Sequence, residues 1–165
     1  MTMEKKTKIS KDTANKKMTV VREFAGSLEQ VWNAWTDSNL LDQWWAPEPW
    51  KARTKTINFT EGGYWLYAMV GPDGTEQWAR LDYISILLHD YFTAQDSFCD
   101  AEGNKNKEFS SMTWKNMFHA IEKGTKVEVE ITFENEEDMK KIIEMGFEEG
   151  FTAAHGNLDR LLEKQ

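Results

Sequence analysis

The clearest hydrophobic pattern in the chain lies between Gly124 and Phe133. Val127, Val129 and Ile131 alternate with charged or polar residues, and Phe133 continues the apolar series. A period of two is typical of a β-strand with one buried face and one face in solvent. The sequence therefore predicts a sheet that is wet on one side.

Weaker alternation predicts more strands earlier in the chain. Turn residues separate them, most clearly at Gly71-Pro72-Asp73-Gly74, which favours a hairpin. The expected total is about six to seven antiparallel strands. Their predicted ranges are 18–24, 51–60, 64–70, 75–88, 91–99, 109–122 and 126–133.

Two short helices are predicted after the first strand. Ser27 and Gln30 have the spacing of a capping box, in which each side chain bonds the other residue's backbone N–H. A second helix fits Asn39 to Trp45 and stops before Pro47, because proline cannot continue a helix.

A long helix is predicted at the C-terminal end. Asn135 is a favourable N-cap, and acidic residues follow it where a helix terminus is positive. Apolar residues then recur at helical spacing to the end of the chain, with a bend expected near Gly146. Because one sheet face is wet, this helix must cover the other face. The fold class predicted is α+β, with a curved antiparallel sheet wrapped around the terminal helix.

Composition and charge narrow the class of protein. At 165 residues the chain is expected to form one domain, and no apolar run reaches the length of a membrane span. Residues 1–17 carry a net charge of +4 and are interpreted as a flexible basic N-terminal tail, which leaves −12 on the domain at 18–165. A domain that acidic repels phosphate, so no nucleic-acid partner is expected. Cys99 is the only cysteine, which fits a cytoplasmic protein without disulfides.

No catalytic or metal-binding motif is present. His89, His119 and His155 are far apart in sequence, and Cys99 has no neighbouring cysteine. Neither Gly62-Gly63 nor Gly71-Pro72-Asp73-Gly74 has the spacing of a phosphate-binding loop. The sequence also has no Gly-x-Ser-x-Gly motif, which places the nucleophilic serine of many hydrolases. We therefore expect no metal, no cofactor and no catalysis.

Two polar residues lie on predicted apolar faces. Asp96 shares a strand face with Phe98, so its carboxylate points inward and needs a partner, either Arg80 or backbone amides near the strand end. His155 flanks the apolar stripe of the terminal helix, either as a cavity-facing polar group or as a residue half in solvent.

Several local motifs, in this order and spacing, resemble one known family. They are Val31-Trp32-Asn33-Ala34-Trp35-Thr36-Asp37, Leu41-Asp42-Gln43-Trp44-Trp45-Ala46-Pro47, Gly62-Gly63, Gly71-Pro72-Asp73-Gly74, Asp96-Ser97-Phe98, and Gly150 with Asn157-Leu158-Asp159-Arg160-Leu161-Leu162. The chain resembles the START-like (SRPBCC, helix-grip) superfamily and, within it, the family similar to the C-terminal domain of the activator of Hsp90 ATPase. This resemblance implies an incomplete sheet that grips the terminal helix with a cavity between them. It also implies apolar ligands such as lipids or polyketides.

The function expected is binding of a small, largely apolar molecule in that cavity. The candidate lining residues are Trp44, Trp45, Trp65, Trp78, Asp96, Phe98, Phe118, Phe151 and His155. Trp44 and Trp45 could equally be plain core residues. One alternative is a protein–protein module for an Hsp90-type chaperone, which the lack of the co-chaperone's separate N-terminal domain disfavours. The other is an enzyme acting on an apolar substrate, with His155 and Asp96 as acid–base groups.

Overall fold

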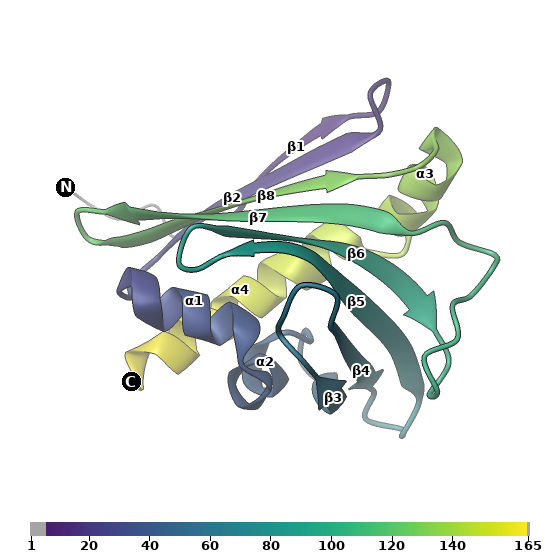
Figure 1. The fold of residues 1–165 in the computed structure, drawn as a ribbon, viewed down its shortest axis with the longest axis horizontal. Helices are drawn as coiled ribbons and strands as arrows, with labels where there is room; N and C mark the ends of the chain where they lie inside the picture. Colours follow the sequence, from purple (N-terminus) through teal and green to yellow (C-terminus); the bar gives the residue numbers. More distant parts are fainter. Residues whose placement is uncertain (1–5, 165) are drawn as a thin grey trace.

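The alternating segment forms strand β8 (Gly124–Thr132), whose Val127, Val129 and Ile131 are buried. It pairs on one side with β2 (Lys17–Phe24) and on the other with β7 (Met112–Ile121). The computed structural model describes residues 6–164 (Figure 1). In this part of the chain all sheet neighbours are antiparallel.

Within residues 6–164 the sheet has eight strands, in the order β1-β2-β8-β7-β6-β5-β4-β3. The α+β helix-grip prediction is confirmed, with one strand more than the upper expected number. The remaining strands are β1 (Lys8–Asp12), β3 (Lys51–Ile57), β4 (Tyr64–Val70), β5 (Glu76–Leu87) and β6 (Tyr91–Cys99).

The additional strand, β1, lies within the segment expected to be a flexible tail. It pairs with β2 at the sheet edge, with Ile9 opposite Val20. The tail prediction for 1–17 is therefore wrong at Lys8–Asp12, and residues 1–5 of that tail lie outside the described residues. The hydrophobic pattern did not reveal β1, because Ile9 is the one apolar residue in Lys8–Asp12. This strand is held at the sheet edge by backbone hydrogen bonds to β2, which leave no mark on the hydrophobic pattern.

The four helices of residues 6–164 are α1 (Leu28–Thr36), α2 (Ser38–Trp44), α3 (Glu136–Glu144) and α4 (Phe147–Glu163). The capping box that starts α1 is present, with Ser27 and Gln30 bonded to each other's backbone N–H groups. The predicted terminal helix is divided in two at Gly146, whose φ is +88°. Glycine adopts this left-handed conformation without the strain a side chain adds.

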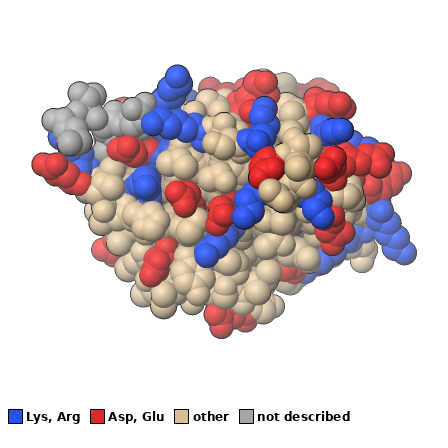
Figure 2. Space-filling model, turned by 90° about the horizontal axis from the view of Figure 1, so that it is seen from above, with Lys and Arg blue, Asp and Glu red and all other residues tan. Residues whose placement is uncertain are grey.

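Helix α4 crosses the concave side of the curved sheet, and α1 and α2 cover the sheet beside it (Figure 1). On the face seen in Figure 2, acidic and basic side chains are interspersed. No helix in residues 6–164 combines the length and the hydropathy that a membrane crossing needs.

Candidate ligand pocket

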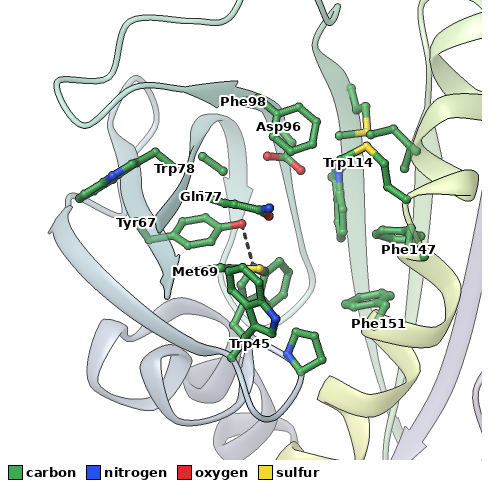
Figure 3. Close-up of a pocket in the computed structure, with 18 residues that line it drawn as sticks. Trp45, Tyr67, Met69, Gln77, Trp78, Asp96, Phe98, Trp114, Phe147 and Phe151 are labelled. Atoms are coloured by element: carbon green, nitrogen blue, oxygen red, sulfur yellow. Dashed lines mark hydrogen bonds between the residues drawn. The ribbon is translucent and has the colours of Figure 1, made fainter. Parts of the chain in front are cut away.

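A pocket of about 350 Å³ lies between the concave sheet face and the junction of α3 and α4 (Figure 3). Its wall comes from four strands, both C-terminal helices and the connection between α2 and β3. The residues that line it are Trp45, Pro47, Trp50, Tyr67, Met69, Gln77, Trp78, Ala79, Asp96, Phe98, Met112, Trp114, Ile142, Met145, Gly146, Phe147, Gly150 and Phe151.

Strand and helix periodicity place these side chains. Tyr67 and Met69 on β4, and Asp96 and Phe98 on β6, are two residues apart and so point to the same face. Phe151 lies one helical turn beyond the start of α4, on the side that faces the sheet. The pocket therefore lies between the concave sheet face and the first turns of α4, with Trp114 of β7 and Phe151 of α4 in contact at one wall.

Buried hydrogen bonds fix the connection that carries Trp45. The Asn157 side chain donates to the backbone oxygens of Ala46 at 3.0 Å and Trp44 at 3.4 Å. Asp42 accepts from the backbone N–H of Thr54 at 3.0 Å, which joins α2 to β3. These bonds give the two family-like motifs at Asp42 and Asn157 a structural role at the pocket rim.

Helix α3 is anchored over the pocket by Asp138. This carboxylate accepts from the backbone N–H and the hydroxyl of Ser110, in the loop between β6 and β7, and these bonds lower its pKa. The Asn135 N-cap accepts from the Asp138 backbone N–H at 2.8 Å. The helix start and the loop are thus joined through one buried side chain.

Asp96 is the only charged side chain among the lining residues, and it is 9% exposed. Burial raises its pKa to about 7, because the ionised carboxylate loses its hydration. The backbone N–H of Ser97 and the indole N–H of Trp114 oppose this shift without cancelling it. The Asp96 carboxyl group is therefore close to half protonated near neutral pH.

Arg80, the sequence candidate for a partner of Asp96, lies on the opposite face of the sheet. Its guanidinium bonds Asp82, with Nε 3.0 Å from Oδ2, and the backbone oxygen of Gly103 at 2.9 Å. Of the two partners considered for Asp96, Arg80 is therefore excluded, because the strand register places Leu81 rather than Arg80 opposite Asp96.

Four of the predicted lining residues point into the pocket: Trp45, Asp96, Phe98 and Phe151 (Figure 3). Trp78 borders it, but its ring points away (Figure 3). That ring lies 5.8 Å from the Arg53 guanidinium and 5.8 Å from the Lys55 ammonium. Gln77 and Ala79 of β5 face the pocket, so the side chain of Trp78 between them points to the other face of the sheet.

Trp44, Trp65 and Phe118 are buried in the core and do not line the pocket. The Trp44 indole donates to the backbone oxygen of Ala34 at 2.9 Å, and the Trp65 indole donates to Thr54 at 2.9 Å. For Trp44 the core alternative considered from sequence therefore describes its position. Trp44 and Trp45 are adjacent in sequence, but Trp44 points into the core and Trp45 points into the pocket.

His155 lies behind Phe151, with 4.3 Å between the ring centroids, and does not line the pocket. Its Nδ1 is hydrogen-bonded to the Thr7 hydroxyl at 2.8 Å, and its Nε2 has no partner among the described residues. Burial and the nearby Arg22 lower the His155 pKa to about 3. His155 and Asp96 share no cavity, so the acid–base pair considered from sequence is not assembled.

Sequence reasoning missed several lining residues, chiefly Tyr67, Met69, Gln77, Trp114 and Phe147. Residues 64–70 are apolar on both faces, so alternation gave no phase for β4. Trp114 and Phe147 are apolar residues at predicted buried positions. Such a position does not indicate whether a side chain lines a pocket or packs in the core. In residues 6–164 no three His, Cys, Asp or Glu side chains lie close enough to hold a metal ion.

Comparison with known proteins gives one family and one fold. The sequence model of the activator of Hsp90 ATPase homolog 1-like proteins matches residues 25–163. An NMR structure from Arthrobacter aurescens is 33% identical, with a TM-score of 0.89, and the match covers 96% of this chain and 92% of that chain.

Other solved structures agree. A Mycobacterium smegmatis protein is 25% identical, with a TM-score of 0.87, over 94% of this chain and 95% of that chain. A Staphylococcus epidermidis protein is 26% identical, with a TM-score of 0.83, over 94% of this chain and 93% of that chain. No curated protein matches.

Proposed function

The chain belongs to the family of activator of Hsp90 ATPase homolog 1-like proteins, and from that premise we propose that it binds a small, largely apolar molecule in its pocket. The observation that carries the proposal is the pocket itself, an opening of about 350 Å³ in a groove that is otherwise filled by side chains. Ligand sites usually begin at about 300 Å³ and combine apolar walls with few polar groups.

The wall chemistry supports an apolar ligand. Rings from four elements surround the opening, and Trp45, Trp114 and Phe151 contact one another with centroids 5.6–5.9 Å apart. Burying apolar ligand surface against such walls contributes about 25 cal/mol per Å². The few polar groups, from Asp96, Tyr67 and Gln77, would set the orientation of the ligand.

Filling the pocket tests the proposal. Ala79 lies on its floor between Tyr67 and Phe98, and Ala79→Phe places a ring in the opening. We expect phenylbutanol, an uncharged apolar probe, to bind the unaltered protein, with the affinity measured by calorimetry. Binding should weaken at least roughly tenfold in Ala79→Phe, since the ring occupies the ligand's volume.

The matched control is Ala120→Phe, the same substitution at an exposed position of β7. This variant should bind the probe as the unaltered protein does. Melting curves check that both variants fold. Equal binding by a folded Ala79→Phe protein would contradict the proposal.

The chaperone alternative uses the outer surface, so the same pair of variants separates it from ligand binding. Association with an Hsp90-type ATPase should be insensitive to Ala79→Phe and sensitive to changes on the exposed faces. If Ala79→Phe abolishes probe binding and leaves association unchanged, probe binding takes place in the pocket and association on the outer surface. If Ala79→Phe instead abolishes association and leaves probe binding unchanged, association takes place in the pocket.

A further inference from the structure

The polar groups of the pocket are one carboxyl group and several neutral groups. Asp96, Tyr67 and Gln77 project toward its centre, and the Trp114 indole nitrogen lies on the side of Asp96 (Figure 3). Among the described residues, no Lys, Arg or His lines the pocket. A negatively charged ligand would therefore meet a carboxyl group and no compensating cation.

Among residues 6–164, no Lys, Arg or His side chain lines the pocket beside the buried Asp96 carboxylate. The nearest basic side chain on the neighbouring strand, Arg80, is paired with Asp82 on the other sheet face. Trp114 Nε1 is buried and makes no hydrogen bond among the described residues, although it lies near enough to influence Asp96. An unpaired buried charge is costly, and a cation placed beside it offsets that cost.

The wall beside Asp96 is aromatic. The ring centroid of Trp114 lies 5.9 Å from that of Trp45, 5.6 Å from Phe151 and 6.0 Å from Phe147. Ring faces attract cations, most strongly when the site is desolvated. The Tyr67 oxygen accepts from the Trp45 indole at 2.9 Å, so its own proton is available to a ligand.

We infer that the ligand of this pocket is an apolar amine, bound as its ammonium ion with the nitrogen at the Asp96 carboxylate and the apolar part against the aromatic wall. The inference rests on the proposed function and names its substrate class. The net charge of −8 adds a long-range attraction for cations.

Of the described residues that line the pocket, Asp96 is the one that titrates near neutral pH. Tyr67 of β4 is the one other titratable lining residue, and burial raises its pKa, which keeps it neutral. On β6 itself, burial raises the pKa of Cys99 to about 11. The lining residues of β5, β7, α3 and α4 are not titratable. Amine affinity should therefore follow the ionisation of Asp96.

Three probes with one apolar body test the inference: phenylbutylamine, phenylbutanol and phenylbutyrate. The amine stays positive and the acid stays negative between about pH 5.5 and about pH 8.5. By calorimetry near pH 8, the amine should bind roughly tenfold or more tighter than the alcohol, and the acid weakest. The amine's affinity should rise roughly tenfold from pH 5.5 to pH 8 as Asp96 ionises.

Asp96→Asn removes the charge without changing the side-chain size. It should weaken amine binding to the level of the alcohol and abolish the pH dependence of amine binding. Glu122→Gln removes one charge in an exposed turn and should change none of these values. The pH series on the unaltered protein tests the same point if Asp96→Asn does not fold.

Alcohol binding as tight as amine binding overturns the inference. So does tighter binding of the alcohol at lower pH, which would make protonated Asp96 a hydrogen-bond donor to a neutral ligand. In both cases loss of probe binding in Ala79→Phe still supports the proposed pocket. No binding by any of the three probes would contradict the proposed function itself.

Discussion

The groove between the sheet and α4 is closed at one end and open at the other. At the closed end, Phe24 of β2 and Trp35 of α1 pack around His155, with ring centroids 5.5 and 6.4 Å from its imidazole. At the open end, the chain turns at Gly146 and leaves the pocket beside Asp96. Phe151 contacts His155 and also lines the pocket, so it separates the two ends.

Both ends bury a titratable side chain, and in both burial favours the neutral form. It lowers the pKa of His155 to about 3 and raises that of Asp96 to about 7. The difference is access: His155 is 1% exposed and enclosed by core side chains, whereas Asp96 faces a pocket that a ligand can enter. A perturbed side-chain pKa alone therefore does not identify a binding site in this protein.

The largest expected difference between the two ends concerns their carboxylates. At the closed end, Asp159 bonds the buried guanidinium of Arg22, with Oδ1 3.1 Å from Nη1. Asp159→Asn leaves that cation without its counter-charge and should lower the free energy of unfolding by about 2–3 kcal/mol. Asp96→Asn removes an unpaired carboxylate and should leave stability equal or higher at neutral pH.

Urea unfolding near pH 7 measures both changes. Glu48→Gln serves as the control, since the Glu48 pair with Arg160 is solvent-exposed and should contribute little. Equal losses for Asp159→Asn and Asp96→Asn would show that Asp96 has a partner after all, and the contrast between the ends would fail.

The next effect is on the pH dependence of stability. His155 stays neutral in the fold but accepts a proton in the unfolded chain below its ordinary pKa of about 6.5, so its contribution is lost as pH falls from there toward 3. Asp96 works in the opposite direction: its contribution is complete below about pH 4 and is lost as pH rises through 7.

Between about pH 4 and pH 6.5 the two slopes oppose each other, each up to about 1.4 kcal/mol per pH unit. His155→Leu should therefore reduce the loss of stability in acid, and Asp96→Asn should increase it, relative to the unaltered protein. Unfolding at several pH values checks both variants. A His155→Leu protein with unchanged acid sensitivity would place that imidazole in contact with water.

The smallest expected effect concerns the N-terminal strand, which helps to close the closed end. Thr7 bonds His155, and Ile9 packs partly against the core. Removing residues 1–12 should lower stability by about 1–2 kcal/mol through lost burial and an unpaired imidazole nitrogen. Removing only residues 1–5 is the control. Phenylbutylamine affinity should be unchanged in both, because the pocket lies at the other end.

The sequence predicted the fold class and most element boundaries closely. Tyr91–Cys99 forms β6 as expected, and Ser27 caps α1 with Gln30. The apolar stripe of the terminal helix does face the sheet, with Ala154 and Leu158 fully buried. These features are local, because period, caps and turns depend on neighbours in the chain.

The composition of the candidate site was predictable only in part. Alternation along 91–99 placed Asp96 and Phe98 on the inward face, and the structure has both there. Hydrophobic periodicity could not predict which of Trp44 and Trp45 lines the pocket, because the two are adjacent at the end of α2. One indole fills the core beside Ala34, and the other reaches Tyr67 across the groove.

Spacing along the chain was enough to predict which residues alternate, which helices are capped and that the terminal helix covers the sheet. Spacing could not predict that the groove is filled around His155 and open beside Asp96. That difference depends on how rings from Phe24, Trp35 and Phe151 meet across strands and helices far apart in sequence. Packing of distant side chains, not local periodicity, determines where space remains for a ligand.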